Sequence, residues 1–300
     1  MPADPDPPDS HPAAPAPWKS PPGLHLIATP IGAARDITLR ALDILAGADV
    51  LAAEDTRSLR RLMEIHGIRL GGRTLIAYHD HNAATARPRL MAALAAGQSV
   101  AYAPEAGTPL VADPGYRLVG AAIAEGHPVH SAPGPSAMLA ALTLSGLPSD
   151  RFLFAGFPPA QAGARRRWMA ELQGVPATLI LYESPKRVCR LLGELCETWG
   201  EAREAALCRE LTKRFEEVRR GSLGALRDGC AADPPRGEVV LVIGAAEDGG
   251  ADPGAEGLAR MLEERMVGMS LKQAVAEVAA ETGLPRRQVY QAALQLGDET

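Results

Sequence analysis

Three loops rich in proline and glycine follow stretches that read as buried strands, and their residue types could hold a small molecule. They span 29–32, 103–109 and 132–136. Glycine lets the backbone approach a ligand closely, and proline fixes a loop without donating an amide. In an open α/β sheet the strand ends line the crevice where ligands bind, so these loops predict a preformed pocket. Ordinary surface turns are the alternative, which three such loops make less attractive.

Acidic residues follow another predicted strand, in the sequence AAEDTR. Glu54 and Asp55 are neighbours there, and Arg57 comes close behind. Paired carboxylates at a strand end could orient a substrate hydroxyl or accept its proton, so both are catalytic candidates. Capping of the following helix by Asp55 and Thr56 explains the pattern equally well.

The segment YHDHN contributes His79 and His81, two positions apart. On a strand, imidazoles at this spacing share a face and could bind a metal ion, but the sequence offers no identifiable third ligand. We therefore predict no metal site, and expect these residues in a polar wall of the cleft or in a subunit contact.

Positive charge is concentrated between residues 151 and 221, although the whole chain has a formal net charge of −5. This segment holds thirteen Lys and Arg residues against nine Asp and Glu. Basic residues interleaved with an aromatic can grip phosphates and stack a base, whereas a solvated charged face is the plainer alternative. The residues concerned are Arg165, Arg166, Arg167, Trp168, Lys186, Arg187, Arg190, Arg209, Lys213, Arg214, Arg219 and Arg220.

Several protein classes lack their signatures in this chain. The sequence has no G-x-x-x-x-G-K-[ST] and no G-x-G-x-x-G, so neither a Walker site nor a dinucleotide fingerprint is predicted. Ser136 follows Gly-Pro as in a nucleophile elbow, but Met138 stands where that motif needs a small residue. The cysteines have neither zinc-site spacing nor the density of a secreted scaffold, which fits a reducing cytosol. No stretch approaches the ~20 apolar residues of a membrane span.

The elements that position these residues alternate between short apolar strands and amphipathic helices, which indicates α/β layers. A break near residues 147–150 separates two sets of five strands. The predicted strands are 24–28, 50–53, 74–78, 99–103 and 128–131, then 152–155, 178–182, 205–208, 217–220 and 239–243. The predicted domains are a disordered tail at 1–22, α/β domains at 23–132 and 133–246, a linker at 247–257 and a helical domain at 258–300.

The last domain has the pattern of a helix-turn-helix. Ser270 and Gln273 form a capping box at a helix start, and Pro285 opens the next helix. Arg286 and Arg287 would then lie where such motifs contact nucleic acid. A helical pair used only for packing or dimerisation accounts for the pattern as well.

Eight motifs occur in order along the chain: LIATPIG with DITLRAL, AAEDTR, YHDHN, EAGTPLVADPGY, PGPSA, LPSDRFLFAGFPP, LILYESPKR and CRELTKRFEEVRRGSL. Together they resemble the ribosomal RNA small subunit methyltransferase I family of the tetrapyrrole methylase superfamily. The likeness runs from about residue 24 to residue 244, and the C-terminal helices are similar to the helix-turn-helix extension of that family.

The resemblance implies two α/β domains of the tetrapyrrole methylase type, with S-adenosylmethionine bound between them, in a cytoplasmic homodimer. It also implies 2′-O-methylation of a cytidine ribose in the decoding region of 16S rRNA, as free rRNA or in the small ribosomal subunit. Carried over by motif, the cofactor-binding residues are Ile31, Gly107, Thr108, Pro109, Val111, Pro133, Gly134, Ser136, Ala137 and Tyr182. The catalytic candidates are Asp55 and Glu54, and the RNA-binding residues are Arg57, Arg165, Arg166, Arg167, Lys186, Arg187, Lys213, Arg214, Arg286 and Arg287.

One departure from the family pattern concerns Pro104 and Glu105, which stand where members commonly have Ser-Asp, so the role of Glu105 is open. Two other functions are alternatives. A precorrin-type tetrapyrrole methyltransferase typically begins with a Gly-Pro-Gly-Asp-like loop, unlike the segment TPIG at 29–32. A non-enzymatic regulator would sense a ligand with its α/β body and bind DNA with its C-terminal helices.

Overall fold

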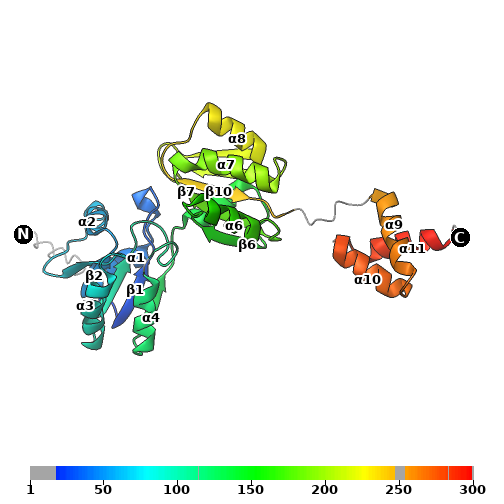
Figure 1. Ribbon diagram of the computed structural model, residues 1–300. Helices are drawn as coiled ribbons and strands as arrows, with labels where there is room; N and C mark the ends of the chain where they lie inside the picture. The colour runs from blue at the N-terminus through cyan, green and yellow to red at the C-terminus, as the bar shows by residue number, and fades with distance from the viewer. Residues whose placement is uncertain (1–17, 114, 247–253, 283, 299–300) are drawn as a thin grey trace, which may run out of the picture. The chain divides into compact units, whose positions relative to one another are not determined.

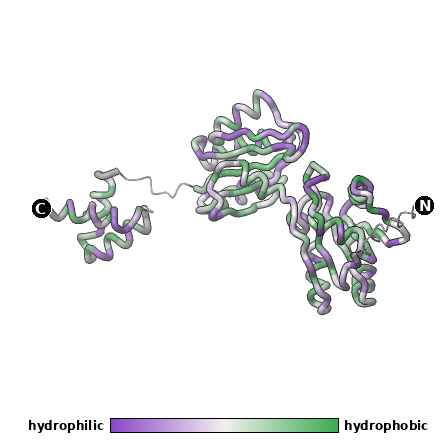
Figure 2. The backbone as a smooth tube through the Cα atoms, turned by 180° about the vertical axis from the view of Figure 1, so that it is seen from behind, coloured by the Kyte–Doolittle hydropathy of each residue, from purple (hydrophilic) through white to green (hydrophobic). Residues whose placement is uncertain are grey.

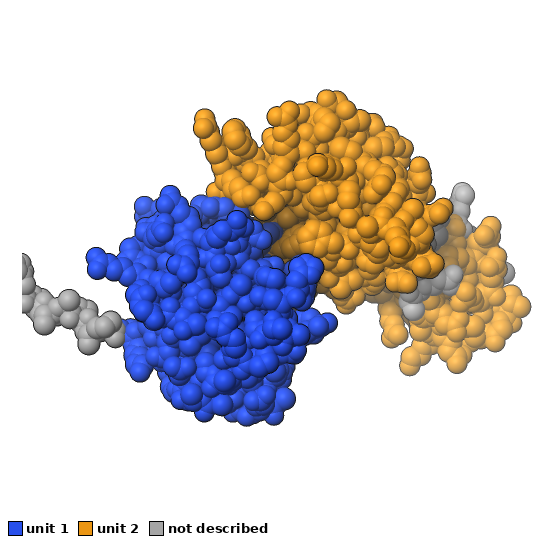
Figure 3. All heavy atoms as spheres, turned by 60° about the vertical axis from the view of Figure 1, so that its left-hand side comes forward, with its two compact units in different colours: residues 1–137 blue, residues 138–300 orange. Residues whose placement is uncertain are grey.

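The computed structural model describes residues 18–113, 115–246, 254–282 and 284–298. The chain divides into two compact units, one ending at Ala137 and the other beginning at Met138 (Figures 1 and 3). The predicted domain boundary lies slightly earlier, between residues 132 and 133, at the end of a strand. Most of the predicted tail, residues 1–17, and most of the predicted linker, residues 247–253, lie outside the described residues.

Unit 1 contains a five-stranded sheet in the order β3-β2-β4-β1-β5, in which every neighbouring pair is parallel. Parallel sheets are covered by helices on both faces, which explains the continuous apolar runs of the strands. The strands are β1 (Gly23–Ile27), β2 (Val50–Ala53), β3 (Thr74–Ala77), β4 (Ser99–Ala103) and β5 (Val129–Ala132). The helices are η1 (Ala34–Asp36), α1 (Leu39–Gly47), α2 (Thr56–Ile65), α3 (Ala83–Ala95) and α4 (Tyr116–Ala124).

Alternate residues of these strands enter two hydrophobic cores, one on each face of the sheet. Tyr102 of β4 joins the core that includes Leu90 of α3 and Leu118 of α4. Ala103, the next residue, joins the core that includes Ile44 of α1 and Leu59 of α2. Because all five strands run the same way, their carboxyl ends lie at one edge of the sheet, and the loops predicted to bind a ligand begin there.

Residues 18–22 do not behave as the disordered tail that the sequence predicts. Ser20 is 3% exposed and its amide donates to Gly47 O at the end of α1. His25 Nε2 lies 2.8 Å from Pro21 O. The proline-rich composition hides these contacts, because they depend on a carbonyl that only the folded α1 places beside the chain.

Unit 2 begins with a mixed sheet in the order β6-β7-β10-β8-β9, in which only β6 and β7 are parallel. The strands are β6 (Phe152–Gly156), β7 (Thr178–Glu183), β8 (Glu204–Arg209), β9 (Glu217–Ser222) and β10 (Val239–Ile243). The helices are α5 (Ala137–Ser145), α6 (Ala162–Leu172), α7 (Pro185–Trp199) and α8 (Leu223–Ala232). All ten predicted strands are therefore present, with boundaries that differ by one or two residues.

A disulfide between Cys189 and Cys230 joins α7 to α8, with their Cα atoms 5.6 Å apart. The sequence does not predict this pair, because the two cysteines are 41 residues apart and only the packing of α7 beside α8 brings them together (Figure 1). Cys196 and Cys208 are free and buried.

Three C-terminal helices share a core of their own. They are α9 (Gly254–Met266), α10 (Leu271–Thr282) and α11 (Arg286–Asp298), and their core includes Leu262, Val278 and Val289. Helix α9 begins at Gly254, inside the span expected as linker. Burial of Leu258 in the core of the C-terminal helices stabilises this first part of the helix despite its glycine content. Along the helices, the residue hydropathy in Figure 2 changes repeatedly between hydrophobic and hydrophilic. Among the described residues, no helix is long and apolar enough to cross a membrane.

Candidate active site

The three loops predicted to bind a ligand meet at the carboxyl edge of the unit 1 sheet. Thr29 and Gly107 exchange backbone hydrogen bonds of 3.0 and 2.9 Å. Thr108 Oγ1 donates to Pro135 O at 2.9 Å, which ties the second loop to the third. Gly107 has φ +79°, a backbone conformation that favours glycine, whereas a Cβ there would make only an ordinary contact of 3.5 Å with Ile31 Cγ2.

Ser136 is the clearest sign that the third loop faces a ligand. Ser136 is 8% exposed, and its Oγ is buried without a hydrogen-bond partner among the described residues. A buried hydroxyl without a partner costs about 1–3 kcal/mol, so such a group in a native fold calls for an explanation. A bound polar ligand would supply the missing partner.

The other predicted cofactor residues of unit 1 lie on the same loops. Pro109 and Ile31 are buried, Val111 is half-buried, and Pro133 and Gly134 are exposed. Ala137, half-buried, begins α5. The second loop then takes a strained path, since Leu110 and Ala112 have φ of +71° and +57°. Such backbone strain in residues other than glycine clusters at ligand clamps.

Tyr182 lies in unit 2, at the end of β7. Its hydroxyl accepts a hydrogen bond from the Met138 amide at 3.1 Å, and its ring packs edge-on against Phe154 and Phe157. Burial raises the pKa of Tyr182, so the hydroxyl stays neutral. Phe157 is 58% exposed, which leaves an aromatic surface beside Tyr182 open within this unit.

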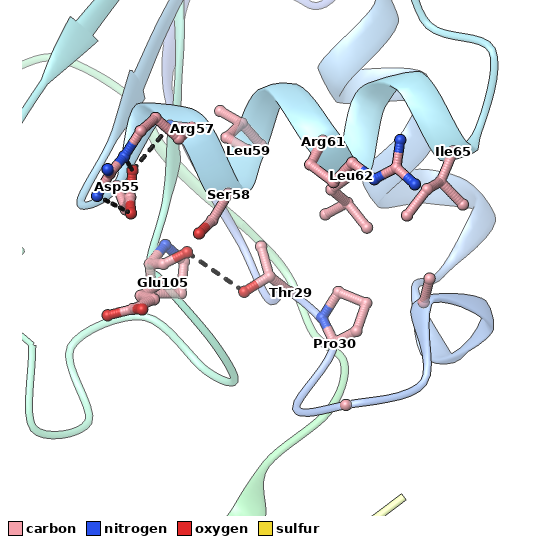
Figure 4. Close-up of a pocket in the computed structure, with 13 residues that line it drawn as sticks. Thr29, Pro30, Asp55, Arg57, Ser58, Leu59, Arg61, Leu62, Ile65 and Glu105 are labelled. Atoms are coloured by element: carbon pink, nitrogen blue, oxygen red, sulfur yellow. Dashed lines mark hydrogen bonds and ion pairs between the residues drawn. The ribbon is translucent and has the colours of Figure 1, made fainter. Parts of the chain in front are cut away.

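A pocket of about 550 Å³ opens in unit 1 between α2 and the first two loops (Figure 4). Thr29 and Pro30 face the side chains of Leu62 and Ile65 across it, and Asp55, Arg57 and Glu105 lie at one end (Figure 4). Thr29 Oγ1 donates to Pro104 O at 3.3 Å, so the first and second loops are joined at the pocket wall. The remaining lining residues are Gly32, Ala34, Ser58, Leu59, Arg61 and Pro104.

Asp55 caps helix α2, as the plainer alternative proposes. Its Oδ1 accepts from the Arg57 amide at 2.8 Å, and its Oδ2 pairs with the Arg57 guanidinium at 3.3 Å. The Arg57 amide, and then the Arg57 side chain, lower the pKa of Asp55. A carboxylate stabilised in its charged form is a weak proton acceptor, so this geometry suits a structural role.

Glu54 is the better placed base of the two. It follows β2 directly and is half-buried, and its Oε2 accepts from the Glu105 amide at 3.0 Å. Burial raises the pKa of Glu54, and the negative charges of Asp113, Glu105 and Asp80 reinforce that shift. A raised pKa brings a carboxylate closer to the range in which it can exchange protons with a substrate. The backbone of Glu105 thus has a clear task in holding Glu54, whereas its side chain is exposed.

A buried phenol network, which sequence reasoning missed, neighbours Glu54. Tyr102 OH donates to Asp113 Oδ1, which also accepts from the Gly115 amide at 2.6 Å. Tyr78 packs edge-on against Tyr102, with ring centroids 5.8 Å apart. Within the described residues, Tyr78 OH and Asp113 Oδ2 are buried without partners. In the sequence, the one sign of this network was a tyrosine in each of two apolar predicted strands, Tyr78 and Tyr102.

Arg165 corrects the predicted set of RNA-binding residues. Its side chain is 3% exposed, and its guanidinium binds both carboxylate oxygens of Glu194 at 2.5 and 2.6 Å. It also donates to the carbonyls of Pro159 and Ala160. The residue ties α6 to α7, and its buried guanidinium uses four of its five N–H donors within the fold, so it is not available to a phosphate. Successive residues of a helix point about 100° apart, so Arg165 can face inward while Arg166 and Arg167 stay exposed.

The other predicted cations of unit 2 differ in whether they form ion pairs within the fold. Arg187 pairs with buried Glu183 at 3.0 Å and donates to Pro158 O. Lys213 pairs with Glu210 and Glu238. Exposed side chains without an ion pair among the described residues belong to Arg166, Arg167, Lys186 and Arg214.

The remaining predicted groups are placed as follows. His79 and His81 lie with ring centroids 6.0 Å apart in the turn after β3. Within the part of the chain that the structure describes, no group of three or more His, Cys, Asp or Glu side chains could hold a metal ion. Arg286 and Arg287 are exposed in the first turn of α11. Arg57 is exposed at the start of α2, with its side chain 90% accessible.

Comparison with known proteins decides the family. A family model described as Tetrapyrrole (Corrin/Porphyrin) Methylases matches residues 23–227, and one described as RsmI C-terminal HTH domain matches residues 251–297. A Mesorhizobium japonicum protein named Ribosomal RNA small subunit methyltransferase I is 52% identical, over 92% of this chain and 93% of its own. The chain belongs to the ribosomal RNA small subunit methyltransferase I family. A Mycobacterium tuberculosis protein of the same name is 44% identical, over 92% of this chain and 96% of its own.

This membership confirms the resemblance read from the eight motifs and places the chain among S-adenosylmethionine-dependent methyltransferases. Solved structures confirm the predicted fold class. A Thermus thermophilus uroporphyrin-III C-methyltransferase complexed with S-adenosylhomocysteine aligns with a TM-score of 0.52 at 20% identity, over 74% of this chain and 97% of its own. A diphthine synthase aligns with a TM-score of 0.58 at 17% identity, over 74% of this chain and 89% of its own.

Proposed function

We propose that this protein transfers the methyl group of S-adenosylmethionine to the 2′ oxygen of a cytidine ribose in the decoding region of 16S rRNA. We further propose that it works in the cytoplasm as a homodimer, on free rRNA or on the small ribosomal subunit. The observation that carries the proposal is the convergence of three strand-end loops beside Glu54 in a member of this family. The names of the relatives favour rRNA over a tetrapyrrole or a DNA site.

The loops of unit 1 fit the proposed cofactor. Ser136 offers an unpartnered buried hydroxyl on the third loop. S-adenosylmethionine supplies an electrophilic methyl group when bound. Holding it would involve Ile31, Gly107, Thr108, Pro109, Val111, Pro133, Gly134, Ser136 and Ala137 of unit 1, with Tyr182 contributed by unit 2.

Alignment supplies most of the rate acceleration in such a reaction. Methyl transfer to a hydroxyl is an in-line displacement, and holding the reacting atoms in contact is worth roughly 7–11 kcal/mol of barrier. The rigid, mutually bonded loops suit this task because they need no ordering when the ligand binds.

Glu54 would take the proton from the ribose hydroxyl as that oxygen bonds to the methyl carbon. We place Glu54 before Asp55 in this role, because burial raises the pKa of Glu54 while capping contacts lower the pKa of Asp55. A positioned base contributes about 10²- to 10⁴-fold. The Glu105 amide fixes the Glu54 carboxylate, a contact that any residue except proline could make at this position.

The RNA backbone would be held by accessible cations, most of them exposed, with the half-buried Arg187 and Lys213 among them. We retain Arg57, Arg166, Arg167, Lys186, Arg187, Lys213, Arg214, Arg286 and Arg287 in this role and remove Arg165. Their attraction to phosphates is unspecific and screened by salt, so sequence selection must come from the base that enters the site.

The decisive experiment maps ribose methylation along 16S rRNA from cells with and without the gene, and repeats the reaction with purified protein and S-adenosylmethionine. The proposal expects one cytidine of the decoding region to lose its 2′-O-methyl group in the deletion strain and to regain it in vitro. An unchanged methylation map, together with no transfer to rRNA or to isolated small subunits, contradicts the proposal.

A further inference from the structure

A groove of about 480 Å³ lies between the first turns of α10 and α11. Its floor includes the buried side chain of Val275 and the half-buried Ala276. Its other lining residues are Lys272 and Gln273 of α10, with Arg286, Arg287 and Tyr290 of α11. The groove therefore has an apolar floor of small side chains and a rim that carries three cations.

Among the described residues of the C-terminal helices, positive charge is left unneutralised only at this groove. Of the other cations of α9–α11, Arg260 pairs with Glu264 at 3.6 Å and Arg265 pairs with Glu277 at 2.8 Å. Lys272, Arg286 and Arg287 make no ion pair with any described residue and are exposed. Three such charges repel one another, which raises the free energy of the unbound protein. A bound anion would neutralise them and lower that free energy.

Tyr290 adds an aromatic wall to the same groove. It is 44% exposed, and it follows Arg286 and Arg287 by four and three positions, so the three side chains share one face of α11. An exposed aromatic ring beside cations is the combination that binds a nucleotide, since the base stacks on the ring while the cations contact the phosphate.

Single-stranded RNA suits this groove better than a DNA duplex. In a duplex the bases stack on one another and are closed to a tyrosine, whereas an unstacked nucleotide can present its face. A recognition helix that follows a major groove contacts phosphates on both sides, yet α11 has no Lys or Arg beyond Arg287 among its described residues. The charge is confined to the turn that meets Tyr290.

We propose that this groove binds one unstacked nucleotide of a single-stranded RNA segment, with its phosphate held by Lys272, Arg286 and Arg287 and its base stacked on Tyr290. The identity of that RNA as small-subunit rRNA rests on the proposed function, whereas the chemistry of the groove does not. The C-terminal helices thus raise affinity for substrate without entering the methyl-transfer step.

The test measures binding of the full-length protein to a short unstructured oligoribonucleotide over a range of salt concentrations. The double variant Arg286→Gln with Arg287→Gln should bind about tenfold more weakly at low salt, and its log–log salt slope should fall by up to about 0.7, since the single phosphate held in the groove contributes about that much. Tyr290→Leu should lose about tenfold in affinity with its salt slope unchanged, and Tyr290→Phe should restore binding.

Arg260→Gln is the matched control, because it removes one charge from the same helices at a cation that is already paired. It should leave affinity and salt slope close to those of the wild type. Unfolding temperature reports whether each variant is folded. Equal affinity and slope for wild type and the Arg286/Arg287 variant overturn the proposal, as does tighter binding of duplex DNA than of the single strand.

Methyl-transfer kinetics separate this proposal from the proposed function. Groove variants should raise KM for the rRNA substrate about tenfold with kcat unchanged. If the groove variants methylate and bind rRNA normally, the groove proposal is wrong and the proposed function still stands. Absence of rRNA methylation by the wild type, with groove-dependent RNA binding intact, overturns the proposed function and upholds the groove.

Discussion

Two neighbouring carboxylates at the end of β2 have opposite environments. Asp55 is held in its charged form by the Arg57 amide and side chain, while Glu54 is half-buried near other acids. Side chains one position apart at a strand end point in different directions, so one can cap a helix while the other faces a site. These environments suit Asp55 to a structural role and Glu54 to the proposed role of a base.

Replacing Glu54 with Gln should lower kcat about 10²- to 10⁴-fold with S-adenosylmethionine affinity unchanged, because the amide keeps the shape but accepts no proton. Single-turnover kinetics and calorimetry measure the two quantities. Asp55→Asn is the control: because asparagine also caps helices well, it should leave stability close to that of the wild type and the rate within a few-fold of it. Equal losses of kcat in both variants contradict the assignment.

The same assignment fixes the pH dependence of kcat. Glu54 acts only when deprotonated, and burial raises its pKa above 4.5. The rate should therefore fall as the pH drops through that raised pKa and reach a plateau above it. A profile of kcat against pH tests this, and an acid limb that persists unaltered in Glu54→Gln would show that another group titrates.

Arg165 and its two neighbours on α6 should respond differently to loss of charge. Arg165→Gln breaks a buried ion pair with Glu194 and should destabilise the protein by about 3–5 kcal/mol. The Arg165 guanidinium lowers the pKa of Glu194, so this contribution is present above the unfolded pKa of about 4.5 and is lost as the pH falls through the lower folded value. Denaturation of wild type and variant from neutral to acidic pH should show the gap closing.

Arg166→Gln with Arg167→Gln is the matched variant on the exposed face. It should leave stability within about 0.5 kcal/mol and should reduce the salt dependence of rRNA binding. A filter-binding titration at several salt concentrations measures this slope. The assignment is wrong if Arg165→Gln is stable and lowers the salt slope of rRNA binding while the Arg166/Arg167 variant is unstable.

At the scale of elements, the strand-end loops form one bonded unit rather than three separate turns. The Thr29–Gly107 backbone pair joins the first to the second, and Thr108 Oγ1 joins the second to Pro135 of the third. Each loop is stiffened by proline, and the cross-links fix their mutual spacing. A ligand held by all three loops should therefore be sensitive to a bulky residue at any one of them.

Thr108→Arg should abolish S-adenosylmethionine binding, because the long side chain replaces a short hydroxyl at the meeting point of two loops. Thr108→Ser keeps the hydroxyl and should bind within a few-fold of wild type. Titration calorimetry on both folded variants measures the affinity. An arginine variant that binds as tightly as the wild type places the cofactor elsewhere.

At the scale of the whole molecule, the chain carries hydrophobic cores that are assembled separately. The C-terminal helices bury their leucines and valines against one another, and the unit 1 sheet has a core on each of its faces. Deletion of residues 247–300 should accordingly leave S-adenosylmethionine affinity unchanged and weaken rRNA binding at least tenfold. Loss of cofactor binding in a truncated protein that remains folded contradicts this independence.

The order of elements and the identity of the loops followed from the sequence alone. Short apolar runs such as VLAA and VVLVI indicate buried strands, and the glycines and prolines of the strand-end loops permit few conformations. The eight motifs in order then indicated the family, because each motif depends only on residues that are close together in the chain. Only tertiary structure could decide which polar groups lie together. Glu54 follows β2, whereas Tyr102 lies in β4 and Asp113 in the loop after it. Arg165 resembles its neighbours in the sequence, and only the packing of α7 against α6 sets it apart. Burial and pairing depend on residues far apart in the chain, so no local pattern encodes them.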